Sequence, residues 1–234
     1  MRSLADQTDD ELGGRWSVLV RQKRDHVRLD RLLEQVQTTS GEEQEAVLHR
    51  IARLVFPHAF AEESVLWPQL RRVLPDGEEL TLQVEEEHQE INELWTRLET
   101  EPASQHGRDR IVARLVELLR EDVRDEEDQL LPRLQEAVDV RTLRRMGIAW
   151  EVVRRTAPTR PHPVVSRRPP GNALAGLPLT VLDRSRDGLD HLARTVPALS
   201  GAATASSRAT GLLAGQLERT RLLRRGEAGP TQRG

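Results

Sequence analysis

The sequence contains no cysteine. This absence excludes disulfide bonds, thiolate nucleophiles, iron–sulfur clusters and zinc sites built from cysteine. Tyrosine is also absent, and the only aromatic residues are four tryptophans together with Phe56 and Phe60. Strands are rich in aromatic and β-branched residues, so a chain with few aromatics and leucine as its main apolar residue favours helices. We therefore predict an all-α fold.

Long hydrophobic runs and a strong net charge are missing as well. No uninterrupted apolar run is long enough to cross a bilayer, and the N-terminal residues lack the apolar core of a signal peptide. We therefore expect a cytoplasmic protein. The formal net charge is −3, which gives no reason to expect a nucleic-acid partner or an anionic membrane.

Four stretches carry apolar residues at the alternating three- and four-residue spacing of a helix face. They cover about residues 16–36, 41–73, 78–98 and the segment after a break at 102–107. Four such helices predict an up-down four-helix bundle, and a further helix is expected at about 140–155. Pro57 is expected to kink or break the second stretch. Ser40 and Glu43 have the spacing of a capping box at its start.

The composition changes near residue 156. Five prolines between residues 157 and 170 cannot continue a helix, so this segment is predicted to be an extended linker. We expect a bundle domain at 1–156, a proline-rich linker at 157–178, and a short amphipathic helical or partly disordered tail at 179–234. The tail is not expected to bind a membrane.

An internal repeat relates the two halves of the bundle. The segment HAFAEESVLWPQLRRVL from His58 aligns without gaps with DVRDEEDQLLPRLQEAV from Asp122, and DHVRLDRLL from Asp25 aligns with EHQEINELW from Glu87. Each half thus reads as one helix with a histidine followed by a second helix that ends in a polar motif. A doubled helical hairpin that closes on itself predicts a pseudo-symmetric bundle.

The repeat places six polar residues on, or within one position of, the apolar stripes of their helices. Residues four apart share a helix face, so the polar pair in each half projects inward. Buried carboxylates that converge on imidazoles need either imidazolium partners or cations. Histidine and carboxylate ligands suit iron and similar transition metals. The candidate metal ligands are His26, His58, Glu62, His88, Asp122 and Glu126, with Glu62 and Glu126 cast as bridges between two ions.

The remaining polar residues receive plainer interpretations. Glu63 and Glu127 are either exposed partners of arginine or hydrogen-bond acceptors for a ligand histidine. The acidic runs at 85–87 and 125–128 are expected to be solvated faces outside the candidate ligands. Solvated histidines are expected at His49, His106, His162 and His191. An apolar lining of the site is expected from Leu29, Ile51, Leu54, Val65, Ile91 and Leu118.

These motifs resemble the hemerythrin HHE cation-binding family over roughly residues 16–136. The resemblance rests on four pieces: an acidic residue before His26; His58 with Glu62, Glu63 and a following Trp-Pro; an acidic residue before His88; and Glu126 and Glu127 with a following Leu-Pro. It implies a four-helix bundle with a non-haem di-iron centre that binds O2 or other small ligands, or serves sensing and iron-related roles. By position, His26, His58, Glu62, His88 and Glu126 match the family's ligands.

One position departs from the family. Asp122 stands where the family would place a histidine, and aspartate is shorter, negatively charged and a harder donor. The site could stay binuclear with a shifted metal, lose one ion or prefer manganese, and we favour retained metal.

Three functions follow as hypotheses. The leading one is a protein with two iron ions (Fe2+/Fe3+) that binds O2 or senses oxygen, NO or redox state without turnover. The second is a di-iron oxidase, peroxidase or ferroxidase. The third is a metal-free helical scaffold for protein interaction. The sequence indicates no particular protein partner.

Overall fold

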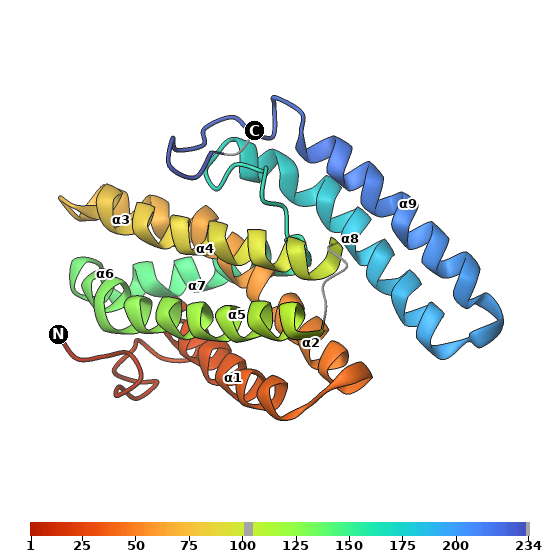
Figure 1. Cartoon of the computed structure of the whole chain (residues 1–234). Coiled ribbons are helices and arrows are strands. Elements are labelled where there is room, and N and C mark those ends of the chain that lie inside the picture. Colours follow the sequence, from red (N-terminus) through yellow and green to blue (C-terminus); the bar gives the residue numbers. More distant parts are fainter. Residues whose placement is uncertain (101–104, 233–234) are drawn as a thin grey trace.

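The computed structural model describes residues 1–100 and 105–232, and these residues form helices and no strand. The predicted all-α bundle is therefore confirmed. Its long helices are α1 (Val18–Thr38), α2 (Gly41–Ala61), α4 (Gly77–Thr100) and α5 (Gln105–Asp125), which lie side by side with alternating direction (Figure 1). In the described part of the chain, the helices are all too short or too polar to pass through a membrane.

The repeat is visible in how the second helix of each hairpin ends. A π-helical segment, Glu62–Leu66, joins α2 to α3 (Trp67–Val73), and a second, Glu126–Leu130, joins α5 to α6 (Leu131–Ala137). In each segment the amide of the residue just before proline bonds a carbonyl five residues back, that of Glu62 or Glu126. Pro68 and Pro132 follow directly and have no N–H with which to restore the α-helical pattern.

Pro57, expected to kink or break the second stretch, does not break it. Pro57 lies inside α2, which continues to Ala61, and the change of helical pattern comes at Glu62. The capping box is wrong, because the Ser40 side chain accepts no capping hydrogen bond. Instead, the Gln44 amide donates to the carbonyls of Val36 and Thr39 (3.1 and 3.0 Å) and closes the α1–α2 turn. Of the expected break at 102–107, residues 102–104 lie outside the described residues, and α5 begins at Gln105.

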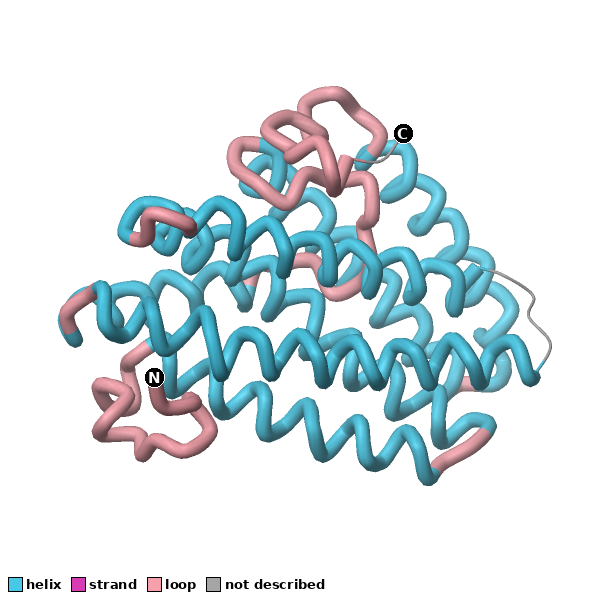
Figure 2. Tube along the Cα trace, turned by 60° about the vertical axis from the view of Figure 1, so that its left-hand side comes forward, coloured by secondary structure: helices cyan, strands magenta, loops and turns pink. Residues whose placement is uncertain are grey.

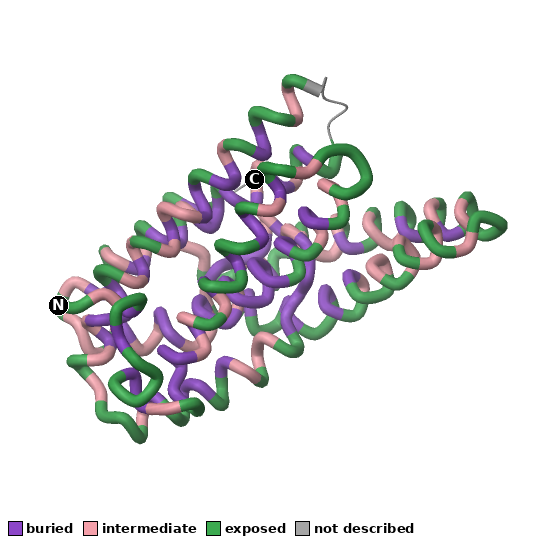
Figure 3. The backbone as a smooth tube through the Cα atoms, turned by 90° about the horizontal axis from the view of Figure 1, so that it is seen from below, coloured by how far each residue is buried: buried purple, intermediate pink, exposed green. Residues whose placement is uncertain are grey.

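Two hydrophobic clusters fill the bundle on either side of the level of the candidate ligands. One contains Ile51, Trp95 and Leu115, and the other contains Trp67 and Trp150. Burial of one large apolar side chain contributes about 1.5–3 kcal/mol, so these clusters fix the helices firmly. Figure 3 shows buried residues along the inner faces of the bundle helices.

Helices beyond the bundle cover its sides. Helix α7 (Val140–Arg155) packs against α1 and α2. Helices α8 (Gly171–Thr195) and α9 (Ser200–Glu218) form an antiparallel pair alongside the bundle (Figures 1 and 2). The described C-terminal residues return to this pair, where the amides of Ser166 and Gly171 donate to the carbonyls of Leu223 and Arg225, each at 3.0 Å.

The expected linker at 157–178 and tail at 179–234 divide differently in the structure. Helix α8 already begins at Gly171 and contains Pro178 in its interior. Pro178 lies on the exposed side of α8, where water can bond the carbonyl group that the proline leaves without a donor. The segment without helix is therefore residues 156–170, and two helices occupy much of the expected tail.

Candidate metal centre

Each of the three candidate histidines is held by a carboxylate. The Nδ1 atom of His26 on α1 lies 2.9 Å from Glu127, that of His58 on α2 lies 3.3 Å from Asp25, and that of His88 on α4 lies 3.0 Å from Glu63. A carboxylate accepts the Nδ1–H and thereby turns the lone pair of Nε2 toward the other side of the ring. All three Nε2 atoms point into the bundle.

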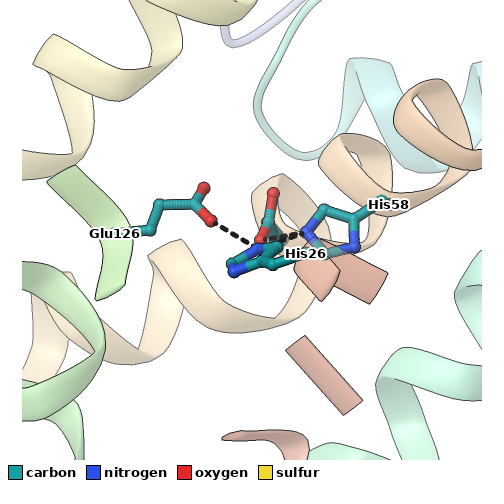
Figure 4. Close-up of side chains that lie close together, drawn as sticks. His26, His58 and Glu126 are labelled. Carbon is teal, nitrogen blue, oxygen red and sulfur yellow. Dashed lines mark hydrogen bonds and ion pairs between the residues drawn. The ribbon is translucent and has the colours of Figure 1, made fainter. Parts of the chain in front are cut away.

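The inward nitrogens lie close together. His26 Nε2 and His58 Nε2 are 3.3 Å apart, and Figure 4 shows the two rings next to each other, with Glu126 directed at His26. With both Nδ1 protons donated to carboxylates, two unprotonated Nε2 lone pairs would repel at this distance. A proton or a metal cation between them removes the repulsion.

The carboxylates complete the cluster from α5 and the two π segments. Glu62 places one oxygen 2.9 Å from His58 Nε2 and the other 3.8 Å from His88 Nε2. Glu126 likewise places its oxygens 3.2 Å from His26 Nε2 and 4.0 Å from His88 Nε2. A carboxylate that divides its oxygens between two histidines has the arrangement of a bridging ligand.

Two overlapping groups of donor atoms result. Donors of His26, His58, Glu62 and Glu126 all lie within 4.8 Å of one another, and so do donors of His88, Asp122 and Glu126. Asp122 joins the second group through an oxygen 3.4 Å from His88 Nε2. The structure thus brings all six sequence-predicted residues to one place, with Glu126 in both groups.

The cluster is buried, and several of its acceptors lack a hydrogen bond. Glu62 and Glu126 are 0% and 1% exposed, and within the described chain no well-aligned hydrogen bond reaches their four carboxylate oxygens. Unsatisfied buried carboxylates are costly and usually mark a missing ion or proton. Three imidazole nitrogens and three carboxylates that converge in this way fit a site for metal cations.

Without a cation, the buried carboxyl and imidazole groups of the cluster have pKa values far from their ordinary ones. Burial together with Glu62 and Asp122 raises the pKa of Glu126 to about 8. Burial lowers the pKa of His26, but Glu126 and Glu127 outweigh it and raise that pKa to about 9. For His58 and His88, burial is likewise outweighed by carboxylates, Glu62 at His58 and Asp122 at His88, so both pKa values lie well above the ordinary one.

The π segments explain why neighbouring glutamates both serve the cluster. In an α-helix, consecutive side chains point about 100° apart and do not face the same interior. The wider π turn lets both Glu62 (0% exposed) and Glu63 (1% exposed) be buried, the first at the Nε2 side and the second at the Nδ1 side of His88. π turns often occur at functional sites.

Asp122 breaks the symmetry between the halves. In the first half Asp25 accepts from His58, and the repeat makes Glu87 and Asp122 the equivalent pair. There two carboxylates meet instead of a carboxylate and an imidazole, and Glu87 keeps a buried oxygen without a hydrogen-bond partner. Burial, Asp122 and Asp125 raise the pKa of Glu87 to about 7.

A cavity of about 20 Å³ adjoins the cluster, and its walls include His26, His58, His88 and Asp122. Of the lining residues expected from the sequence, Leu29 and Leu54 are confirmed. Ile51, Val65, Ile91 and Leu118 are not part of the lining and belong to the hydrophobic clusters or their edges. The other apolar lining residues are Val55, Ala59, Leu119 and Val123.

The small cavity meets a larger groove. This groove, about 1100 Å³ in volume, runs between α1 and α5, and shares His26, Leu29, Leu119 and Val123 with the cavity. The shared side chains are the boundary between solvent and the cluster, and a small molecule would cross it there.

Some functional neighbours were missed in the sequence. The role of Asp25 as the hydrogen-bond acceptor of His58 is not among the sequence predictions. The signal for it is that an acidic residue precedes the histidine in both halves of the repeat. Glu63 and Glu127 take the second of their two proposed roles, as acceptors for ligand-type histidines.

Two expectations of solvation are wrong. His162 is 7% exposed and lies 3.1 Å from Asp183, which in turn accepts from the amides of Thr159 and Arg160. Glu85, expected on a solvated face, is 0% exposed and paired with arginines. His162 and Arg168, one of the arginines that pair with Glu85, lie in residues 156–170, and the helical pattern of the sequence does not indicate where this segment lies.

Comparison with known proteins agrees with the geometry. Residues 18–134 match the model of the hemerythrin HHE cation-binding domain. An uncharacterized hemerythrin-like protein of Schizosaccharomyces pombe is 26% identical over 134 residues, which are 57% of this chain and 66% of that protein, so the chain spans just under two thirds of its relative. No solved structure gives a significant match. The chain belongs to the hemerythrin HHE cation-binding domain family, and its cation-binding domain is the bundle described above.

Proposed function

We propose that the chain holds two iron ions between His26, His58, Glu62, His88, Asp122 and Glu126, and binds O2 or NO there as a carrier or sensor. The observation that carries this proposal is the set of three inward Nε2 atoms facing carboxylate oxygens that lack hydrogen bonds. Cations between these groups would bond both the imidazole nitrogens and the carboxylate oxygens, which otherwise need unusual protonation states to coexist.

The charges around the cluster support two divalent cations. The carboxylates in contact with it are the three candidate ligands and the three acceptors of the histidine Nδ1 protons. Two guanidinium groups face the latter, with Arg154 3.6 Å from Asp25 and Arg167 3.7 Å from Glu63. Six negative and two positive groups leave four negative charges, which two divalent ions neutralise in a medium where uncompensated charge is costly. Glu87 titrates near pH 7 and adds at most part of a charge.

The size and lining of the cavity favour a very small uncharged ligand. A water-sized molecule needs about 10–15 Å³ on this volume scale, so about 20 Å³ admits a diatomic gas and little else. Leu29, Leu54 and Leu119 keep water away from this space. When bound, the iron pair supplies reversible electron exchange with such a gas, while the protein holds the imidazoles in one tautomer and excludes solvent.

The oxygen-rich donor set favours one enzymatic alternative. Asp122 adds a third carboxylate where the family would place an imidazole, and carboxylates stabilise higher oxidation states and harder ions such as manganese. This favours a ferroxidase or peroxide-consuming activity as the second candidate. Stopped-flow oxidation of the ferrous protein separates the two, since repeated turnover of iron or peroxide supports the enzyme and a long-lived oxygenated species supports the carrier or sensor.

The test is metal analysis of protein purified without oxygen. We expect about two iron ions per chain and an absorption spectrum that changes when air or NO is added. Because the unfolded chain lacks a formed site, we also expect a chelator to lower the melting temperature. A protein without stoichiometric transition metal, whose melting is insensitive to chelator, would instead be the metal-free scaffold.

A further inference from the structure

A segment outside the matched family domain reaches the metal cluster. Arg167 lies in the connecting segment 156–170, beyond residues 18–134, yet it is only 8% exposed. Its Nη1 lies 3.7 Å from Glu63 Oε1, and the same oxygen lies 3.0 Å from His88 Nδ1. A continuous polar path therefore leads from the C-terminal extension (residues 157–232) through one carboxylate to a candidate ligand.

Contacts on both sides fix Arg167 in place. Its Nη2 donates to Gln89 Oε1 on α4 at 2.9 Å, and its backbone amide donates to the carboxylate of Glu227 near the end of the described chain. Asn172 at the start of α8 donates to its carbonyl at 3.1 Å. The guanidinium therefore stays at Glu63 only while the extension is docked.

We propose that Arg167 is a positioning residue through which the C-terminal extension raises the reduction potential of the metal pair. This inference rests on the proposed metal centre. Arg167 touches no metal or ligand gas, and its effect passes through Glu63 and His88.

The direction of the effect follows from electrostatics. A buried guanidinium draws electron density from the Glu63 carboxylate and makes it a weaker acceptor for the His88 Nδ1 proton, so the imidazole is a poorer donor to the metal. Its positive charge also disfavours the more highly charged, oxidised metal pair. Both effects raise the reduction potential, and loss of Arg167 lowers it.

The repeat provides an internal comparison. Glu127 is the equivalent of Glu63 and accepts from His26, but among the described residues no arginine pairs with it, and it faces the open groove instead. Neighbouring arginines that anchor the extension pair elsewhere: Arg168 with Glu78 and Glu85, and Arg160 with Asp187 and Asp190. Only Arg167 in this segment is directed at a carboxylate that holds a candidate ligand.

Linkage makes the effect reciprocal. If docking of the extension favours the reduced metal pair, oxidation weakens docking by the same factor. The extension thereby gains a function as the element that reports the redox state of the centre. We expect amide hydrogen exchange in residues 157–232 to be faster in protein oxidised with ferricyanide than in protein reduced with dithionite.

The experiment compares Arg167→Gln, Arg167→Lys and Arg168→Gln in the full chain. Arg168→Gln is the matched control, because it removes an adjacent arginine that also joins the extension to α4, and Arg71 remains to pair with Glu85. Two readouts are needed: the ring ¹⁵N resonances of His88 in metal-free protein, and the reduction potential of iron-loaded protein.

Arg167→Gln is expected to shift the His88 resonances and to lower the reduction potential, with both restored toward wild type in Arg167→Lys and unchanged in Arg168→Gln. The positioning role is refuted if Arg167→Gln alters only the melting temperature. It is also refuted if Arg168→Gln shifts the potential equally while amide hydrogen exchange shows that residues 157–232 stay docked. If the protein proves unable to bind iron and Arg167→Gln still shifts the His88 resonances, the proposed function and the inferred effect on potential are both overturned. The Arg167–Glu63–His88 connection would still stand.

Discussion

Replacement of Asp122 by histidine should tighten the metal site. The variant exchanges a carboxylate for an imidazole that can donate Nδ1–H to Glu87, whose buried oxygen now lacks a hydrogen-bond partner, just as His58 donates to Asp25 in the other half. Such a carboxylate–histidine pair changes metal affinity about 10–100-fold. That range corresponds to about 1.4–2.7 kcal/mol of added stability at saturating metal, or a rise in melting temperature of about 3–10 °C for a chain of this size.

The assay is competition for ferrous iron with a chromophoric chelator under anaerobic conditions, accompanied by thermal melts with and without metal. Asp122→Asn is the control, because it removes the charge without supplying an imidazole, and it should not bind iron more tightly. The absorption spectrum of iron-loaded Asp122→His should also differ from that of wild type. If affinity and spectrum are both unchanged, Asp122 is not a metal ligand and the pairing with Glu87 is irrelevant to the site.

Three further predictions concern the ligands, the entrance and the extension. Glu126→Gln should stabilise metal-free protein by about 1–4 kcal/mol, because the chain no longer has to protonate this buried carboxyl group, whose pKa is raised to about 8, when it folds. The same variant should weaken metal binding at least about 100-fold, and denaturant melts of both forms check the opposite signs. Val123→Phe, at the boundary of cavity and groove, should slow NO association about tenfold, equivalent to an added barrier of about 1.4 kcal/mol. Val27→Phe, in the outer part of the groove, should leave the association rate unchanged, and stopped-flow mixing measures both rates. Burial lowers the pKa of His162, but Asp183 outweighs it and raises that pKa to about 9. Because the pKa of His162 is higher in the folded than in the unfolded chain, this ionisation stabilises the fold by about 3 kcal/mol below about pH 6.5, and the stabilisation is lost as pH rises through 9. The free energies of unfolding of wild type and His162→Gln, measured by urea melts, should therefore converge as pH rises through 9.

The helices and the convergence of the six candidate ligands could be predicted because both leave periodic signals. Apolar spacing located α1, α2, α4 and α5 to within a few residues, since each buries one face. The repeat then placed ligand-type residues at equivalent levels of two hairpins, and convergence followed from the geometry of a closed bundle. Departures from periodicity were harder to predict: Pro57 is accommodated within α2, and the π turn at Glu62 shifts the helix phase without any change of composition.

The contacts of the extension could not be predicted because they depend on segments distant in sequence. Arg167 meets Glu63 only after α8 and the final described residues have fixed the connecting segment, and proline-rich sequence carries no period that would indicate which side chains turn inward. The burial of His162 could not be predicted for the same reason, because its partner Asp183 lies on α8, which begins after the connecting segment.

Two departures from the repeat's symmetry converge on one histidine. Asp122 adds a negative charge 3.4 Å from His88 Nε2, and Arg167 adds a positive charge behind Glu63 at His88 Nδ1. Asp122→His should therefore raise the reduction potential and Arg167→Gln should lower it, so the double variant should lie near wild type. If the arginine compensates for the aspartate through the shared imidazole, the two changes should also be non-additive in a double-mutant cycle. Strict additivity, with each shift unaffected by the other substitution, would mean that the charges act on the metal independently and that His88 does not couple them.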